Sequence, residues 1–278
     1  MTAKTVNKLA VPGATLHYEV TGSGPMLLLI PGGGTDTGVF DNIVGQLAAD
    51  YTVVVYDPRG NSRSRYGGAP VDERVEVSAD DALTLIDAIS GDEPAFVFGS
   101  SSGAITGLDL IARHPDRVRM LVAHEPPAVE VLPDAGTARA FFQDVYDTYR
   151  RDGVELAQRL FAGGTGMDED DLPLEDLRPE FRELVARMDA NAGNFFAHKL
   201  LPFTRYQPDL AALKEVADKI VPAAGIESSR HLPAQPIVVL ADQLGWPVVS
   251  FPGGHSGYAS HPVQFATLLA RVLEAELS

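Results

Sequence analysis

The segment "GSSSG" at residues 99–103 holds three consecutive serines, each with a hydroxyl group that can act as a nucleophile. A serine hydroxyl attacks a carbonyl only when a base removes its proton and the backbone presents its oxygen clear of the chain. A sharp turn from a strand into a helix presents it in this way, and the residues two positions before and after the serine must then be small. Only Ser101 has glycine at both of these positions, so the pattern predicts Ser101 as the nucleophile.

The base that activates a serine is most often a histidine. His255 lies in "FPGGHSGY", just after a predicted strand at residues 247–251, and the neighbouring glycines let its loop approach another segment closely. The remaining histidines occupy ordinary structural positions: His17, His114, His124, His198, His231 and His261. We therefore expect His255 to act on Ser101.

Acyl transfer also needs two converging N–H groups that stabilise the developing oxyanion. The backbone amide of Ser102, at the start of the helix after Ser101, is one candidate donor. The other is the amide of Gly33, in the glycine-rich stretch "PGGG" at residues 31–34, for which a plain turn is the alternative interpretation. We expect Gly34 and the small side chain of Ser100 to lie beside the substrate.

Buried strands that alternate with helices must position these residues. The run "MLLLI" at residues 26–30 is typical of a strand buried on both faces. Further strands are expected at residues 52–57, 95–99, 119–124, 219–224 and 247–251, and helices at about 39–49, 77–90, 102–114, 231–244 and 261–277. Two earlier strands flank a turn at Pro12-Gly13, and Ser78 with Asp81 has the spacing of a capping box. This alternation predicts an α/β fold with a mostly parallel, doubly wound sheet.

The alternation is interrupted from about residue 127 to 208, where the chain is helical in pattern and acidic, with no buried strand. We expect this segment to be a helical insertion, or lid, over one edge of the sheet. The core is then formed by residues 1–126 and 209–278. The insertion is rich in phenylalanine, and some of these side chains are candidates to line an apolar pocket: Phe141, Phe142, Phe161, Phe181, Phe195, Phe196 and Phe203.

The composition excludes several classes of function. The chain has 278 residues, no cysteine and a net charge of −16. The absence of cysteine excludes disulfides, thiolate zinc sites and a cysteine nucleophile. The negative charge argues against a nucleic-acid partner and an anionic membrane surface. The first residues contain no apolar stretch of signal-peptide length, and no apolar run is long enough to span a membrane. We therefore expect a soluble, cytoplasmic protein.

No metal site is evident, and we interpret the acidic run "DEDD" at residues 168–171 as a solvated loop. The expected partner is a small-molecule substrate. The sequence leaves open whether the chain forms a homodimer.

Four motifs, in order, resemble the α/β-hydrolase superfamily: "PGGG" (31–34), "DPRGNSRS" (57–64), "GSSSG" (99–103) and "GGHSGY" (253–258). The resemblance covers nearly the whole chain. It implies a serine hydrolase that needs no cofactor, with a helical cap between the sixth and seventh strands. Two positions depart from the family pattern, because Pro31 stands where histidine is frequent and Ser62 stands where glycine is usual.

The carboxylate that orients His255 has two candidates. The family usually places it in the loop after the seventh strand, where Ser228 occupies the aspartate position and Glu227 lies next to it. A minority of relatives place it directly after the sixth strand, where this chain has Glu125. A charge at the end of a buried strand needs a partner, which slightly favours Glu125. The sequence leaves both glutamates open.

These residues predict hydrolysis of a small apolar ester or lactone through an acyl-enzyme on Ser101. A cofactor-free relative of the same fold, such as a perhydrolase or a carbon–carbon hydrolase, is the main alternative. A binding protein that retains the triad residues is another. A nucleotide-dependent oxidoreductase is a weaker one, because Gly32 and Gly34 before a helix, with Asp57 after the next strand, only partly resemble a dinucleotide fingerprint.

Overall fold

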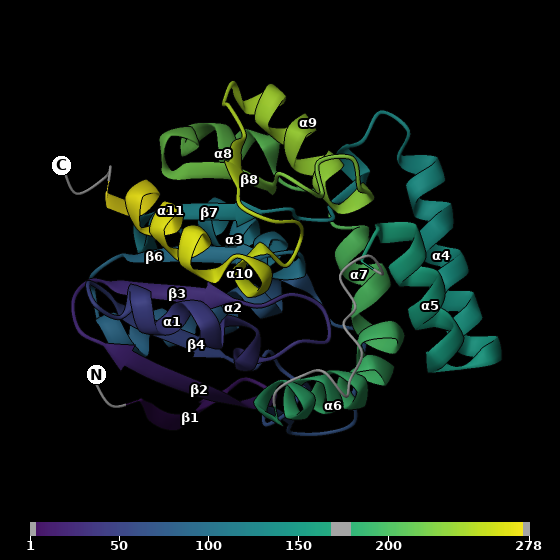
Figure 1. Ribbon diagram of the computed structural model, residues 1–278, viewed down its shortest axis with the longest axis horizontal. Helices are drawn as coiled ribbons and strands as arrows, with labels where there is room; N and C mark the ends of the chain where they lie inside the picture. Colours follow the sequence, from purple (N-terminus) through teal and green to yellow (C-terminus); the bar gives the residue numbers. More distant parts are fainter. Residues whose placement is uncertain (1–3, 168–178, 275–278) are drawn as a thin grey trace.

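The computed structural model describes residues 4–167 and 179–274, and a single twisted sheet runs through them (Figure 1). The strand order is β1-β2-β4-β3-β6-β7-β8-β9, and β5 pairs with β2. The strands are β1 (Thr5–Val11), β2 (Ala14–Gly22), β3 (Met26–Ile30), β4 (Thr52–Tyr56), β5 (Arg65–Tyr66), β6 (Ala95–Ser100), β7 (Val118–His124), β8 (Ile220–Gly225) and β9 (Val249–Phe251). Pairing is antiparallel at β1, β2 and β5 and parallel from β4 to β9. The predicted mostly parallel α/β fold is confirmed.

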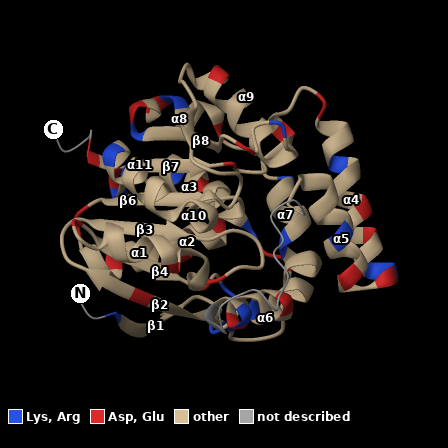
Figure 2. Ribbon diagram, in the orientation of Figure 1, with Lys and Arg blue, Asp and Glu red and all other residues tan. Residues whose placement is uncertain are grey.

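Helices bury both faces of the sheet because side chains alternate along each strand. In β3, Leu28 and Ile30 join one apolar cluster, and Leu27 and Leu29 join the other. The first cluster packs under α2 (Val75–Ser90), α3 (Ser102–Arg113), α8 (Leu210–Glu215) and α9 (Gln235–Leu244). The second packs under α1 (Asp41–Leu47), α10 (Gly257–Ser260) and α11 (Pro262–Glu274). The central strands β3, β4 and β6 carry no charged residue (Figure 2).

Within the chain between β7 and β8, the described residues between 135 and 204 form a separate group of helices. These are α4 (Ala135–Asp152), α5 (Val154–Thr165), α6 (Pro179–Asn194), a π-helical turn (Phe195–Lys199) and α7 (Leu200–Thr204). They have an apolar cluster of their own, and in Figure 1 α4 and α5 are the outermost pair while α6 and α7 lie nearer the sheet. All of them fall within the predicted insertion at residues 127–208. The acidic run at 168–171 lies outside the described residues.

The predicted capping box at the start of α2 is wrong. The helix begins at Val75, with Arg74 at the N-cap position, so Ser78 lies inside its first turn. The Asp81 carboxylate is 2% exposed and accepts hydrogen bonds from Arg59 Nε (2.8 Å) and Nη2 (2.6 Å). This side chain is therefore used to hold the loop after β4. The two-residue strand β5 was not expected from the sequence.

Across residues 4–167 and 179–274, the structure contains no helix that is both long enough and apolar enough to cross a lipid bilayer.

His124 ends β7 inside the core, beneath the carboxyl edge of the sheet. It is fully buried among the rings of Phe98, Phe251 and Phe265, and neither ring nitrogen has a hydrogen-bond partner. Burial lowers the pKa of His124 to about 4, an effect that the neighbouring Glu125 charge only partly opposes. The imidazole is therefore neutral in the folded chain at neutral pH.

We expect His124 to make the folded protein sensitive to mild acid. The unfolded chain binds a proton at this histidine below about pH 6.5, whereas the folded chain binds it only near pH 4, so the free energy of unfolding falls as the pH drops through this window. The loss is about 3 kcal/mol. Denaturant unfolding at several pH values checks it: His124→Phe should show a shallower pH dependence than the wild type. Parallel curves for His124→Phe and the wild type would contradict the expectation.

Candidate active site

Ser101 occupies a strained turn between β6 and α3. Its backbone has φ 57° and ψ −125°, a conformation that residues with a side chain rarely adopt. The Ser101 amide donates a hydrogen bond to the carbonyl of His124 (2.9 Å), which ties the turn to the end of the neighbouring strand β7. Ser101 is half-buried, whereas Ser100 before it is fully buried.

The turn at Ser101 requires glycine on both sides for steric reasons. A Cβ on Gly99 would lie 2.4 Å from the Gly103 carbonyl oxygen, and one on Gly103 would lie 2.2 Å from the Ile30 oxygen. The loop after β3 is equally close, since a Cβ on Gly32 would lie 2.6 Å from Ser101 Cβ. The glycine spacing that singled out Ser101 in the sequence is therefore a packing requirement of this turn.

His255 and Glu125 form a buried pair at the carboxyl edge of the sheet. His255 Nδ1 lies 2.5 Å from Glu125 Oε2, and the carboxylate is fully buried. The other carboxylate oxygen accepts hydrogen bonds from the amide of Gly225 (2.8 Å) and from the hydroxyl of Ser228. Glu125 itself has φ 49°, so the backbone bends where β7 ends.

These contacts decide the charge of Glu125. Burial alone raises the pKa of this carboxyl, but the hydrogen bond and charge of His255, together with His124 and Ser228, outweigh burial and lower it to about 2. Glu125 is therefore ionised across the physiological range and holds the Nδ1 side of the imidazole.

The structure places the second candidate acid elsewhere. The Glu227 side chain is exposed, and its backbone amide donates to the Gly253 carbonyl (3.0 Å). The adjacent residue Ser228 turns inward and hydrogen-bonds Glu125. In this structure His255 therefore pairs with Glu125 and not with Glu227, the alternative that the sequence left open.

Gly33 and Ser102, the predicted oxyanion donors, lie against each other. The Gly33 amide donates to Ser102 Oγ (2.7 Å), and Gly33 has φ 44°, a conformation that suits glycine. Ser102 is the first residue of α3, so its own amide belongs to the unpaired first turn of a helix, where negative charge is stabilised.

Gly34 and Ser100, the two residues expected beside the substrate, differ in where they lie. Gly34 is half-buried beneath the insertion, where its carbonyl accepts a hydrogen bond from Asn191 Nδ2 (2.8 Å). Ser100 is fully buried at the end of β6 and offers no surface for a substrate, so the expectation for Ser100 is wrong. The alternating side-chain directions of β6 place it in the core.

Two asparagines that the sequence analysis did not single out hold the loop around Gly33. They are Asn61, which follows β4, and Asn191, on α6. No local pattern marks either residue, because their partners are distant in the sequence. Asp57, the residue that a dinucleotide-binding protein would place on a ribose, is fully buried and bonded to Arg63 and to the Thr37 amide.

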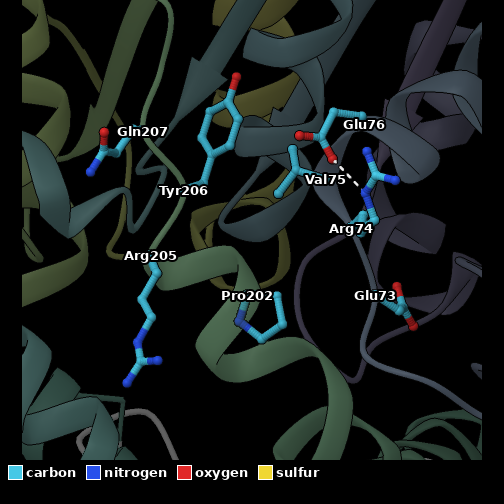
Figure 3. Close-up of a pocket in the computed structure, with 8 residues that line it drawn as sticks. All are labelled: Glu73, Arg74, Val75, Glu76, Pro202, Arg205, Tyr206 and Gln207. Atoms are coloured by element: carbon cyan, nitrogen blue, oxygen red, sulfur yellow. Dashed lines mark ion pairs between the residues drawn. The ribbon is translucent and has the colours of Figure 1, made fainter.

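The hollow drawn in Figure 3 lies apart from these residues. It has a volume of about 350 Å³ and is lined by residues that include Glu73, Arg74, Arg205 and Tyr206, none of them a predicted site residue. Among the described residues, no three histidine, aspartate or glutamate side chains are grouped so that they could hold a metal ion.

Comparison with known proteins agrees with this architecture. Residues 25–163 match the family model described as the alpha/beta hydrolase fold. An uncharacterized hydrolase, YraK, of Bacillus subtilis is 38% identical over 98% of each chain, and a zearalenone hydrolase of Cladophialophora bantiana is 31% identical over 93% of this chain and 92% of its own. A thermophilic esterase from Thermogutta terrifontis superposes with a TM-score of 0.77 at 19% identity over the full length of both chains. The chain therefore belongs to the alpha/beta hydrolase fold family and is a hydrolase.

Proposed function

We propose that this hydrolase cleaves an apolar ester or lactone through an acyl-enzyme on Ser101. The observation that carries the proposal is the buried Glu125–His255 pair, which lies one strand away from the strained turn of Ser101. The imidazole contacts one oxygen of the buried carboxylate, and two further donors contact the other oxygen. A carboxylate held in this way orients a catalytic base.

In the proposed reaction, His255 is the general base. Its Nδ1 is engaged by the ionised Glu125, so Nδ1 carries the proton and Nε2 is free to accept one. Nε2 removes the proton of the Ser101 hydroxyl while Oγ attacks the carbonyl carbon of the substrate. The imidazolium then protonates the leaving oxygen as its bond to carbon breaks. Water, deprotonated by the same nitrogen, attacks the acyl carbon. The bond from this carbon to Ser101 Oγ then breaks, the imidazolium returns the proton to Oγ, and the carboxylic acid is released.

The amides of Ser102 and Gly33 are the proposed donors to the oxyanion. In this structure the Gly33 amide donates to Ser102 Oγ. The Ser102 hydroxyl must therefore turn away from Gly33 before both amides can donate to a substrate oxygen, a rotation about a single side-chain bond.

Two features support an apolar substrate of the lactone class. The ring of Phe195 lies over Gly33, with its Cε2 3.4 Å from the position of a Cβ on that glycine, and it packs edge-to-face on Phe161. A surface of this kind favours an apolar group next to the reacting carbonyl. A relative 31% identical over most of its length is named a zearalenone hydrolase, and zearalenone is itself a lactone.

Replacing Ser101 with alanine should abolish hydrolysis of short p-nitrophenyl esters, with a loss of at least about 10³-fold in kcat, because no other hydroxyl replaces the nucleophile. Labelling by a fluorophosphonate probe should disappear in the same variant. Ser100→Ala is the matched control, since this neighbouring serine is buried, and it should keep both activity and labelling. Full activity of Ser101→Ala would refute the acyl-enzyme mechanism.

Exchanging each glutamate for glutamine should separate the two candidate acids. Glu125→Gln removes the charge that holds His255 and is expected to lower kcat by roughly 10²–10⁴-fold. Glu227→Gln changes an exposed side chain and should stay within about twofold of the wild type. Steady-state kinetics on one ester, with circular dichroism to verify folding, provides the measurement. Equal losses in both variants would assign no special role to Glu125.

The lactone proposal is tested with zearalenone as the substrate. The wild type should convert it to a product heavier by one water, followed by liquid chromatography and mass spectrometry, and Ser101→Ala should not. If the wild type hydrolyses p-nitrophenyl esters but leaves zearalenone unchanged, the mechanism stands and this substrate is excluded.

A further inference from the structure

One face of α6 and its π-helical turn contacts two loops of the core, the loop after β3 that carries Gly33 and the loop after β4. Four side chains at intervals of four residues make these contacts: Arg187, Asn191, Phe195 and Lys199. Residues spaced in this way share one side of a helix. The glycine loop (residues 32–35) is thus covered by a stripe of the insertion that begins more than 150 positions later in the sequence.

The core supplies part of the support for the glycine loop. The carbonyl of Gly32 accepts hydrogen bonds from the Thr35 amide (3.1 Å) and hydroxyl (2.5 Å). Asn61 Nδ2 donates to the carbonyls of Gly33 (3.1 Å) and Thr35 (2.8 Å). Three of the four carbonyls of the loop are therefore held from within the core, and only that of Gly34 is left for another partner.

The insertion supplies that partner. Asn191 is 5% exposed, and its Nδ2 donates to the Gly34 carbonyl (2.8 Å) and to Ser62 Oγ (2.9 Å). Its Oδ1 accepts the Ser62 amide (2.7 Å), so every hydrogen-bonding group of the carboxamide is used. Arg187 reinforces the contact through Asp36, a fully buried carboxylate that also accepts the Ser62 hydroxyl (2.7 Å).

The backbone of Ser62 indicates that this contact is a specific arrangement. Ser62 has φ 45°, in the left-handed region that favours glycine. Such a conformation persists in a residue with a side chain only where surrounding bonds determine it. Here those bonds come from Asn191 on the amide and from Asp36 and Asn191 on the hydroxyl.

We propose that Asn191 is a positioning residue, which holds the glycine loop so that the Gly33 amide faces the reaction centre. The proposal rests on the proposed function, because it concerns the donor to the oxyanion. Glycine peptides rotate readily, and a rotated peptide directs a carbonyl oxygen to the place where a donor is needed. Docking of α6 against the core thereby becomes a condition for a complete oxyanion site.

Asn191→Asp tests the proposal with an almost isosteric side chain that cannot donate to Gly34. We expect kcat and kcat/KM for a p-nitrophenyl ester to fall together by about tenfold or more, with KM changed by less than about threefold, because the lost interaction forms in the transition state. Hydrogen exchange of the peptide that contains residues 32–35 should become faster in this variant. Replacing a residue that only stabilises the fold would not change kcat, and it would not selectively accelerate hydrogen exchange in this loop.

Asn194→Ala is the matched control. Asn194 lies on the same helix and joins it to the core through the Tyr66 hydroxyl (3.3 Å), whereas the insertion's hydrogen bond to the Gly34 carbonyl comes from Asn191. This variant should keep kcat within about twofold of the wild type, since Arg187 and Asn191 still hold α6 against the core and the Gly34 carbonyl keeps its donor. Asn191→Ser, which introduces no charge, replaces the aspartate variant if that chain does not fold.

A folded Asn191 variant with wild-type kcat would overturn the positioning role, and so would an equal loss in Asn194→Ala. Either result leaves the acyl-enzyme mechanism intact as long as activity still depends on Ser101. Activity that survives in Ser101→Ala refutes the proposed function instead, so the two failures are distinguishable.

Discussion

The carboxylate of Glu125 is the constraint around which the carboxyl edge of the sheet is organised. A charge with no exposed surface is tolerated only when hydrogen bonds and an opposite charge compensate for its lost hydration. Its partners come from the strands that follow in the sheet: Gly225 ends β8, Ser228 lies in the loop after β8, and His255 lies after β9. On its other side, the residue before it accepts the amide of Ser101. The ends of β7, β8 and β9 are thereby joined through one side chain, and the end of β6 is attached to them through the His124 carbonyl.

The helical insertion is tied to this edge by polar contacts as well as by apolar packing. Besides the contacts around Asn191, the fully desolvated ammonium of Lys199 lies 3.4 Å from Glu73 and 3.3 Å from Asn61 Oδ1. Removing one member of a buried ion pair leaves the other charge without compensation, which is far more costly than the loss of a surface pair. Docking of the insertion is therefore sensitive to single polar substitutions at Lys199 in the π-helical turn and at Glu73, which precedes α2.

The features that follow local steric rules could be predicted from the sequence. The glycines around Ser101 permit a turn that any larger residue would block, and the unbroken apolar run of β3 marks a strand covered on both faces. The choice between Glu125 and Glu227 could not be predicted, because it depends on which side chain turns inward from two neighbouring loops. Here Ser228 takes the inward position beside Glu125, and Glu227 turns to solvent.

Polar contacts between residues distant in the chain could not be predicted from the sequence either. The spacing of Ser78 and Asp81 suggested a helix cap, but Asp81 is engaged by Arg59 from a distant loop. Asn191 bonds Ser62 across 129 positions, and no periodicity or composition records such a contact. Ser62 was noticed as a departure from the family pattern, yet only the structure relates that departure to a partner in the insertion.

The left-handed backbone of Ser62 also bears on how the core and the insertion can be recombined. A core with glycine at this position accepts different insertions without strain, because it requires no bonds to hold the turn. In this chain the strained serine and the buried Asp36 both depend on residues of α6. A chimera whose insertion lacked counterparts of Arg187 and Asn191 would inherit an uncompensated charge at Asp36 and a turn at Ser62 without support. The two parts of this chain are therefore suited to each other, and transfer of its insertion to another core is expected to require Asp36 and Ser62 along with the helices.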